Sequence, residues 1–290
     1  MKSAIYILIL LLGLIIIAPV EGTAQRRRHI QKLELGMLAG LSYYYGDIAN
    51  YNFQPESLKP AAGVILRYHL SPSFTLRGNA MYCRIFAADS NLKTTDDTQW
   101  QRFRNLAFYS DVYELSGMVE YNIIADKNRG KTVRSRVIPY VFGGVGLFYF
   151  EPKAIHPITG NPVALRPLQL DGSSYSPIAY AMPVGLGLRI YANKNWVIGL
   201  EFGMRLTTTS HLDDIDGSSR YPNPESLISD DARIMASRNN NSMNHTTQMV
   251  PNFSGKPRGK IDYITDIYFI NGITVSYRFW KFKAIRKGRF

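Results

Sequence analysis

Eight stretches of this 290-residue chain carry apolar side chains at every second position, and the segments that join them alternate between short and long. The predicted strands span residues 32–44, 60–70, 73–86, 111–124, 136–150, 178–191, 195–208 and 263–279. The second, fourth and sixth connections are compact, whereas the first, third, fifth and seventh are long. This alternation is typical of outer-membrane β-barrels, whose strands meet in tight turns on the periplasmic side and in long loops outside the cell. We therefore predict an all-β fold, a closed eight-stranded antiparallel transmembrane barrel with both chain ends in the periplasm.

The first 24 residues have the pattern of a cleaved signal peptide. Lys2 supplies positive charge, residues 5–20 are apolar, and residues 22–24 are small enough for a cleavage site. A membrane anchor is the alternative, but it would need about 20 apolar residues. The predicted divisions are a signal peptide at residues 1–24, a basic periplasmic N-terminus at 25–31, the β-barrel at 32–280 and a basic periplasmic tail at 281–290.

The polar faces of the strands carry charges of both signs. At mid-membrane each charge would cost on the order of a few kcal/mol if it faced lipid, so we expect these side chains to point inward and to neutralise one another. The predicted interior residues are Glu34, Arg67, Arg77, Glu114, Glu120, Arg189, Glu201 and Arg205, together with Arg278. Because an eight-stranded barrel is only wide enough to be filled by its own side chains, we predict a plugged interior and not a diffusion pore. Cys83 is the only cysteine, which excludes an intramolecular disulfide.

Positive charge is concentrated in segments that the strand order assigns to the periplasmic side. The formal net charge of the chain is +12, and the rest of the sequence is close to neutral. The cations that we predict to bind a partner are Arg26, Arg27, Arg28, Lys127, Arg129, Lys131, Arg134, Lys281, Lys283, Arg286, Lys287 and Arg289. Two interpretations remain open: solubility or attraction to anionic phospholipid head groups of the inner leaflet, or docking of an acidic periplasmic protein. Nucleic acid is not expected as a partner in this compartment.

Two of the long connections have contrasting compositions. Residues 151–177 are rich in proline and glycine, which predicts a lid that folds back on the barrel. Residues 209–262 contain the polar tract SRNNNSMNHTTQ, which has too little apolar surface to fold alone. We expect that tract to be mobile, or ordered only by a partner.

Two local patterns are candidates for a metal site and for a catalytic site. The segment HLDDIDG, with Asp213, Asp214 and Asp216, has some features of a calcium loop, but it lacks the acid spacing and distant glutamate of an EF-hand. A turn with aspartate caps explains it as well. Ser210 beside His211 is the nearest arrangement to a catalytic dyad, and the sequence contains no nucleophile elbow and no HExxH motif. We therefore predict no enzyme activity, no catalytic or cofactor-binding residue, no cofactor and no metal.

Six segments carry a family resemblance. They are YYYGDIAN (43–50), NLAFYSDVYELSGMVEYNI (105–123), IPYVFGGVGLFYFEPKA (138–154), LRPLQLDG (165–172), VIGLEFGMRLTTTSHLDDIDG (197–217) and GKPRGKIDYITDIYF (255–269). In this order they resemble the PorG family, the small outer-membrane barrel of the type IX secretion system of Bacteroidetes. The chain departs from the family pattern at QLDGSS, where the family resembles GTEGQG, and at SHLDDID, where it resembles TDYLDDVS.

The resemblance implies a structural, non-enzymatic role. Proteins of the PorG family are thought to anchor the periplasmic ring of the PorK lipoprotein and PorN to the outer membrane, in a machine that exports proteins and in some species supports gliding motility. It implies PorK-like and PorN-like ring subunits and outer-membrane lipid as partners. The alternative is a generic outer-membrane barrel that binds an extracellular ligand through its long loops.

Overall fold

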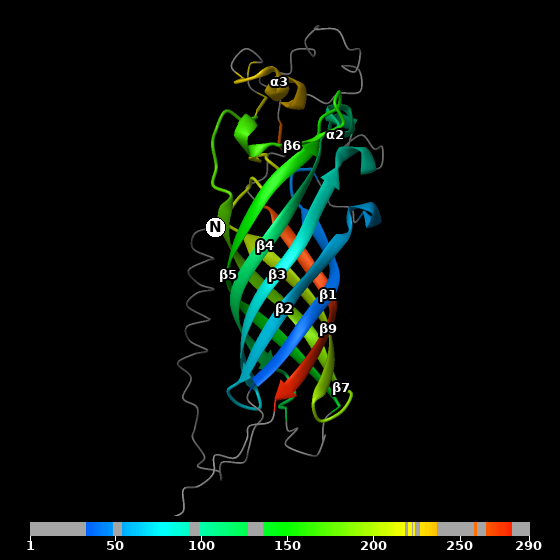
Figure 1. Ribbon diagram of the computed structural model, residues 1–290, viewed down its shortest axis with the longest axis vertical. Coiled ribbons are helices and arrows are strands. Elements are labelled where there is room, and N and C mark those ends of the chain that lie inside the picture. Colours follow the sequence, from blue (N-terminus) through cyan, green and yellow to red (C-terminus); the bar gives the residue numbers. More distant parts are fainter. Residues whose placement is uncertain are drawn as a thin grey trace, which may run out of the picture.

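Eight long strands form a closed antiparallel barrel in the computed structural model (Figure 1), which describes residues 33–48, 54–92, 99–126, 136–217, 220–221, 223, 227–236, 258–259 and 265–279. The strands are β1 (Leu33–Tyr45), β2 (Lys59–His69), β3 (Phe74–Ala88), β4 (Ala107–Asn122), β5 (Val137–Ile155), β7 (Ile178–Tyr191), β8 (Trp196–Thr207) and β9 (Ile267–Phe279). Each strand pairs with its neighbours in the chain, and β1 pairs with β9 to close the sheet. The predicted eight-stranded antiparallel barrel is therefore confirmed.

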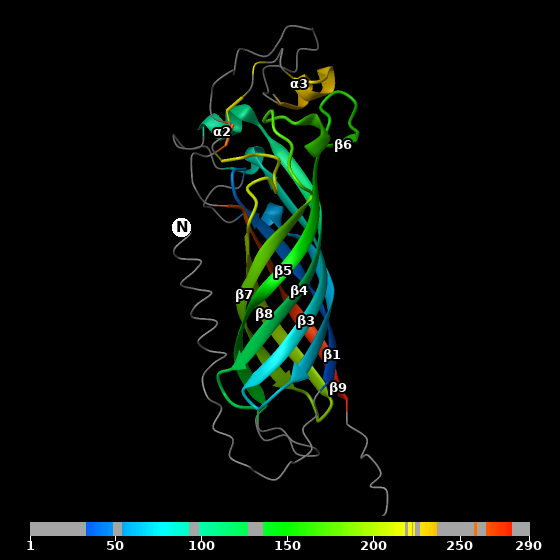
Figure 2. The same cartoon turned by 90° about the vertical axis from the view of Figure 1, so that its left-hand side faces the viewer.

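Short elements occupy the four long connections, all at one end of the barrel (Figure 1). They are η1 (Pro55–Ser57), η2 (Asp89–Asn91), α2 (Gln99–Arg104), β6 (Pro162–Ala164), η4 (Arg166–Leu168) and α3 (Asp230–Ala236). The three short connections join the strands at the other end, as Figure 2 shows from a second side. We call the described residues of the four long connections the cap, and the opposite end the short-turn rim.

Two strands extend further toward the cap than the sequence predicts. β4 begins at Ala107 and not at residue 111, and β5 continues to Ile155 and not to residue 150. Their extra residues mix polar and apolar types, among them Phe108 and Lys153, so the outward positions are no longer regularly apolar. Their backbones still pair, because Ala107 faces Ala88 and β5 gains β6 as a second partner. β9 begins at Ile267 and not at residue 263; residues 260–264 lie outside the described residues.

The barrel is apolar outside and charged inside. In β1, Leu35 and Met37 are 44% and 67% exposed, whereas the intervening face holds Glu34, which is fully buried. Aromatic side chains ring the wall at both ends: Tyr113 marks the cap side of β4, and Tyr121 the rim side. The eight residue steps from Tyr113 to Tyr121 span about 26 Å of strand, or roughly 20 Å of height at the usual tilt. Such a surface is suited to a bilayer, so the strands form a transmembrane barrel. None of the short helices in the described part of the chain has the length or apolarity to cross a membrane.

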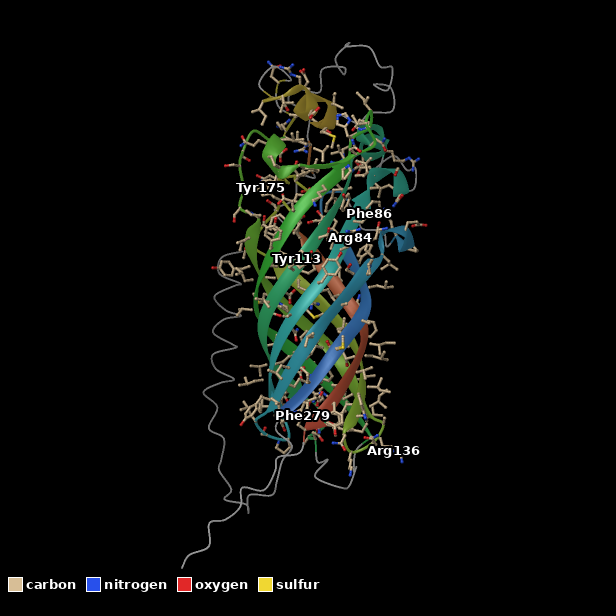
Figure 3. All side chains as sticks on the ribbon, in the orientation of Figure 1. Arg84, Phe86, Tyr113, Arg136, Tyr175 and Phe279 are labelled. Atoms are coloured by element: carbon tan, nitrogen blue, oxygen red, sulfur yellow. The ribbon has the colours of Figure 1, made fainter. Side chains whose placement is uncertain are left out.

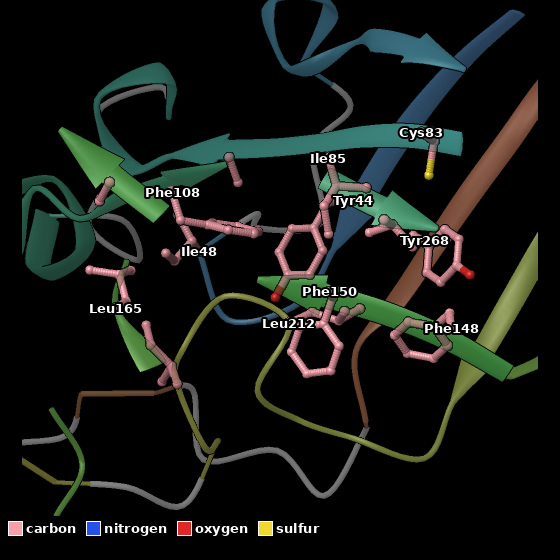
Figure 4. Close-up of a cluster of buried hydrophobic side chains, with 14 of the residues drawn as sticks. Tyr44, Ile48, Cys83, Ile85, Phe108, Phe148, Phe150, Leu165, Leu212 and Tyr268 are labelled. Atoms are coloured by element: carbon pink, nitrogen blue, oxygen red, sulfur yellow. The ribbon is translucent and has the colours of Figure 1, made fainter. Parts of the chain in front are cut away.

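A second, apolar core joins the upper barrel to the cap (Figure 4). The inner face of the barrel contributes Tyr44, Phe108 and Phe150, and the connections contribute Leu165 and Leu212, all at most 5% exposed. The connection between β5 and β7 therefore folds back on the barrel, as predicted. Part of the connection between β8 and β9 also packs into this core, whereas the polar tract at residues 237–248 lies outside the described residues.

Candidate functional site

The barrel interior holds a balanced set of charges, which we call the interior network. The structure places all eight predicted interior residues and Arg278 there, and it adds Asp126, which the sequence analysis assigned to a turn. Each member is at most 9% exposed. The five arginines are Arg67, Arg77, Arg189, Arg205 and Arg278, and the five carboxylates are Glu34, Glu114, Glu120, Glu201 and Asp126. The interior network therefore carries no net charge, and the formal net charge of the chain arises outside it.

Arg67 lies at the centre of this network and contacts carboxylates from three other strands. Its Nη1 is 3.0 Å from Glu34 Oε1, its Nε is 2.9 Å from Glu120 Oε1, and its Nη2 is 2.7 Å from Glu201 Oε1. Arg77 binds the two oxygens of Glu201 at 2.9 and 2.8 Å. Such forked contacts use the planar geometry of guanidinium, which a lysine ammonium does not offer.

The remaining pairs extend the network toward both ends of the barrel. Toward the short-turn rim, Arg278 contacts Glu34 at 2.8 Å and Asp126 at 2.6 Å. Toward the cap, Arg205 lies 3.2 Å from Glu114. Arg189 pairs with Glu120.

Neutral donors complete the shell of these carboxylates. Tyr140 donates to Glu201 at 2.5 Å, Tyr268 to Glu114 at 2.8 Å, and Tyr191 to Asp126 at 2.6 Å. Buried charges that are paired and hydrogen-bonded in this way are tolerated, whereas unpaired ones are costly. The lumen is thus packed with its own side chains, as expected for eight strands.

Most predicted partner-binding cations cannot be placed. Arg26, Arg27, Arg28, Lys127, Arg129, Lys131, Arg134, Lys281, Lys283, Arg286, Lys287 and Arg289 all lie outside the described residues. The described ends of their segments meet at the short-turn rim, because Leu33 pairs with Phe279, and Arg136 follows the turn between β4 and β5. Arg136 and Lys194 are exposed cations of the same rim, where Figure 3 labels Arg136 and Phe279.

In the structure Asp213, Asp214 and Asp216 of the candidate calcium loop have separate partners. Asp214 instead accepts hydrogen bonds from Tyr175 Oη at 2.7 Å and from Arg258 Nη2 at 3.2 Å. Burial raises the pKa of Asp214 to about 6. The amide of Asp216 donates to Asp171. These carboxylates therefore fasten parts of the cap to one another.

A different carboxylate group forms in the cap from Asp47, Asp213 and Asp266, whose oxygens lie within 4.8 Å of one another. Backbone amides of Ile48 and Ile215 donate to Asp213, at 3.2 and 3.1 Å. Burial raises the pKa of Asp213, and repulsion from Asp266 and Asp47 adds to the effect.

Asp266 has a similar environment. It accepts hydrogen bonds from Tyr44 Oη at 2.7 Å and from the Leu212 amide at 2.8 Å. Burial raises its pKa, and the nearby Asp47 carboxylate raises it further. No local motif predicts this group, because its members come from the ends of β1 and β9 and from the β8–β9 connection.

Ser210 and His211 are not arranged as a nucleophile and its base. Ser210 Oγ donates to Asp216 at 3.4 Å, and the His211 ring stacks on Tyr175 with centroids 4.5 Å apart. Burial lowers the pKa of His211. Within the described residues no hydrogen bond joins the two side chains, and the absence of enzyme activity stays a prediction.

The chain matches one family model and is distantly similar to several solved structures. A family model described as a domain of unknown function (DUF6089) matches residues 9–229. No curated protein matches the sequence. Among solved structures, Neisserial surface protein A is 8% identical, with a TM-score of 0.41 over 85% of this chain and 97% of that chain. Ail of Yersinia pestis is 11% identical, with a TM-score of 0.39 over 86% and 98%. Outer membrane protein W of E. coli is 11% identical, with a TM-score of 0.33 over 88% and 100%.

Proposed function

We propose that this chain, which belongs to the DUF6089 family, is a structural, non-enzymatic component of a bacterial outer membrane. Its proposed task is to anchor a periplasmic ring of PorK-like and PorN-like subunits in a type IX protein secretion system. The resemblance to the PorG family over residues 43–279 supports the assignment to a type IX secretion system. The plugged, neutral interior supports the role, because a filled barrel serves as an anchor and not as a conduit.

The observation that carries this proposal is the balance of the interior network. Five arginines face five carboxylates inside the barrel, so the formal net charge of +12 must be carried by other parts of the chain. The sequence concentrates it before β1, after β9 and between β4 and β5. A single-sign surface steers an acidic partner and fixes its orientation.

The proposed orientation puts the short-turn rim and both chain ends in the periplasm, and the cap outside the cell. Short turns on the periplasmic side are the rule for bacterial outer-membrane barrels. In this orientation all three basic segments start from the face that meets a periplasmic ring. Exposed charges are screened over about 8 Å at physiological ionic strength, so capture of the ring should weaken as salt is added.

The test is capture of the ring by variants with altered tail charge. The variant K281E/K283E/R286E/K287E/R289E reverses the five tail cations, and R220E/R233E reverses two cations of the cap as a matched control. Both proteins should remain heat-modifiable on a gel, which reports a folded barrel. We expect the tail variant to lose the ring and the control to retain it. Co-purification of the tail variant with a full ring would place the contact elsewhere.

The runner-up is a barrel that binds an extracellular ligand through its long loops. The buried pairs that fasten the cap favour this alternative, because they make it an ordered platform: Asp89 with Arg104 at 2.7 Å, and Arg258 with Asp171 and Asp214. Deletion of residues 237–248 separates the two functions. Loss of an extracellular ligand with full ring capture would support the runner-up.

A further inference from the structure

The outward-facing charges of the barrel wall are confined to one place. In the described strands, the charged side chains that share the outward face are Arg84, Asp111, Glu151 and Lys153, on the neighbouring strands β3, β4 and β5. Arg84 pairs with Asp111 in the strand register, and Asp111 with Glu151. The outward positions of β7, β8, β9 and β1 are uncharged. We call these four residues the exterior charged cluster.

A row of three tyrosines lies directly below this cluster, on the membrane side. Tyr82 pairs with Tyr113, and Tyr113 pairs with Tyr149, with ring centroids 5.3 and 6.5 Å apart. The hydroxyls of Tyr82 and Tyr149 donate to Asp111 and Glu151, each at 2.8 Å. Figure 3 shows Tyr113 below Arg84 and Phe86 on the same face. The row marks the level at which tyrosines lie in membrane proteins, between hydrocarbon and head groups.

Below the tyrosine row the wall is hollowed by a groove of about 640 Å³. Small residues make room for it, among them Ala62 and Ala80, while Met37, Leu115 and Leu147 extend it sideways. The groove runs from β1 across to β5, and Ile178 at the start of β7 borders it. Strands are about 4.8 Å apart, so it spans roughly 19 Å of wall and takes several acyl chains side by side. Its volume is in the range of pockets that bind small molecules.

The exterior charged cluster has two cations and two carboxylates, and two more cations lie beside it. Asp111 binds Arg84 Nε at 2.7 Å and Nη2 at 3.0 Å, no described residue hydrogen-bonds to Nη1, and the Arg84 side chain is 43% exposed. Lys153 pairs in register with Tyr109, whose ring lies under the Arg84 guanidinium at 5.4 Å.

Two further cations reach the same face. Arg166 Nε lies 3.4 Å from Glu151, and Lys59 Nζ lies 4.4 Å from the centre of the Phe86 ring. Four cations thus lie beside Asp111 and Glu151, and the exposed Glu56 lies next to Lys59, whose Nζ donates to its carbonyl oxygen at 3.3 Å. An arginine beside a lysine is an arrangement that binds phosphate well.

We propose that this face binds lipid A, the phosphorylated, multiply acylated glycolipid of the outer leaflet, with a phosphate at Arg84 and Lys153 and acyl chains in the groove. The ligand must be apolar below the tyrosine row and anionic above it, and it must reach the wall through the bilayer. The leaflet next to the cap is the outer one in the proposed orientation, on which this inference rests. It does not depend on the ring.

The test is a lipid titration followed by native mass spectrometry of the full chain folded in detergent. Three probes are used: diphosphorylated lipid A, dephosphorylated lipid A and phosphatidylglycerol. The wild type should bind diphosphorylated lipid A at least about tenfold more tightly than either of the other two lipids. Dephosphorylated lipid A lacks the charge-assisted hydrogen bonds to phosphate, and phosphatidylglycerol has too few acyl chains to fill the groove. Equal binding of dephosphorylated lipid A, or of phosphatidylglycerol, overturns the proposal.

Variants divide the site into its two parts. R84Q/K153Q removes the cations, and Ala80→Trp fills the groove while it leaves the cations in place. Each should weaken lipid A binding about tenfold, whereas R136Q/K194Q at the short-turn rim should bind as the wild type does. Unchanged lipid A binding by R84Q/K153Q, or by the Ala80→Trp protein, contradicts the inference. The finding that another membrane protein covers this face in place of lipid would also contradict it. Ring capture by R84Q/K153Q is measured in parallel, so that failure of the ring proposal is recognised separately.

Discussion

Arg205 and Glu114 offer a direct test of whether the lumen is dry. They lie 3.2 Å apart, with side chains 3% and 1% exposed. If Arg205 is replaced by methionine, Glu114 keeps only the neutral donors Ser116 at 2.7 Å and Tyr268 at 2.8 Å. Removing one partner of a buried ion pair costs about 3–5 kcal/mol because it leaves an uncompensated charge. In a water-filled lumen the same change would cost only about 0–1 kcal/mol.

The double variant R205M/E114Q separates these two cases. Because it also removes the stranded carboxylate, we expect it to recover more than half of the loss in the single variant, about 2 kcal/mol or more. The free energy of unfolding is measured by urea titration in lipid vesicles. The exposed pair Arg84 and Asp111 serves as the control, and Arg84→Met should cost less than about 1 kcal/mol. Equal stabilities for R205M and R205M/E114Q, both close to wild type, would refute the dry plug.

Three further predictions concern the cap, the lumen and catalysis. Burial raises the folded-state pKa of Asp213 and Asp266 above the unfolded value of about 3.9. The stability that these two groups contribute is therefore fully present below about pH 3.9, and it is lost as the pH rises through their folded-state pKa. The protection factors of the Ile48, Leu212 and Ile215 amides, which correct exchange rates for the intrinsic base catalysis, should therefore fall from acid toward neutral pH. Asp213→Asn should flatten that dependence; an unchanged profile would show that the group is not responsible. In planar bilayers the purified chain should give no steady channel conductance, because the interior network fills the lumen, and regular ohmic steps would contradict this. Ser210→Ala and His211→Ala should leave protein secretion intact, since the two side chains are not joined; a secretion defect with a folded barrel would revive the enzyme hypothesis.

Strand periodicity was enough to assign the interior residues but not their partners. A period of two fixes the face on which Glu34 or Arg67 lies. The contacts of Arg67 with Glu120 and Glu201 depend on how eight strands are staggered around the barrel, which no local pattern encodes. The inward position of Asp126 was missed for a related reason. Asp126 lies four residues after Asn122, the last residue of β4, where the alternation has already ended.

The cap and the exterior charged cluster show where sequence reasoning stops. Asp47, Asp213 and Asp266 meet only after the barrel closes, so the sequence offered only the chain neighbours Asp214 and Asp216 as candidates to join Asp213. Arg84 shares the outward face of β3 with Tyr82. The cost of placing a charge in lipid argues against an outward-facing arginine. The structure resolves the conflict, because Arg84 lies above the tyrosine row and not at mid-membrane.

Photo-crosslinking in intact cell envelopes tests the anchoring role most directly. A photoreactive residue replaces Arg28, Lys131 or Arg286 in the basic segments, and Ile228 of the cap, which is 64% exposed, serves as the control position. If the basic segments hold the ring, the three basic positions give adducts with an acidic periplasmic ring protein that added salt reduces, and the control position gives none. Adducts with that protein from the cap position alone, or none from any basic position in a folded barrel, would contradict the anchoring role.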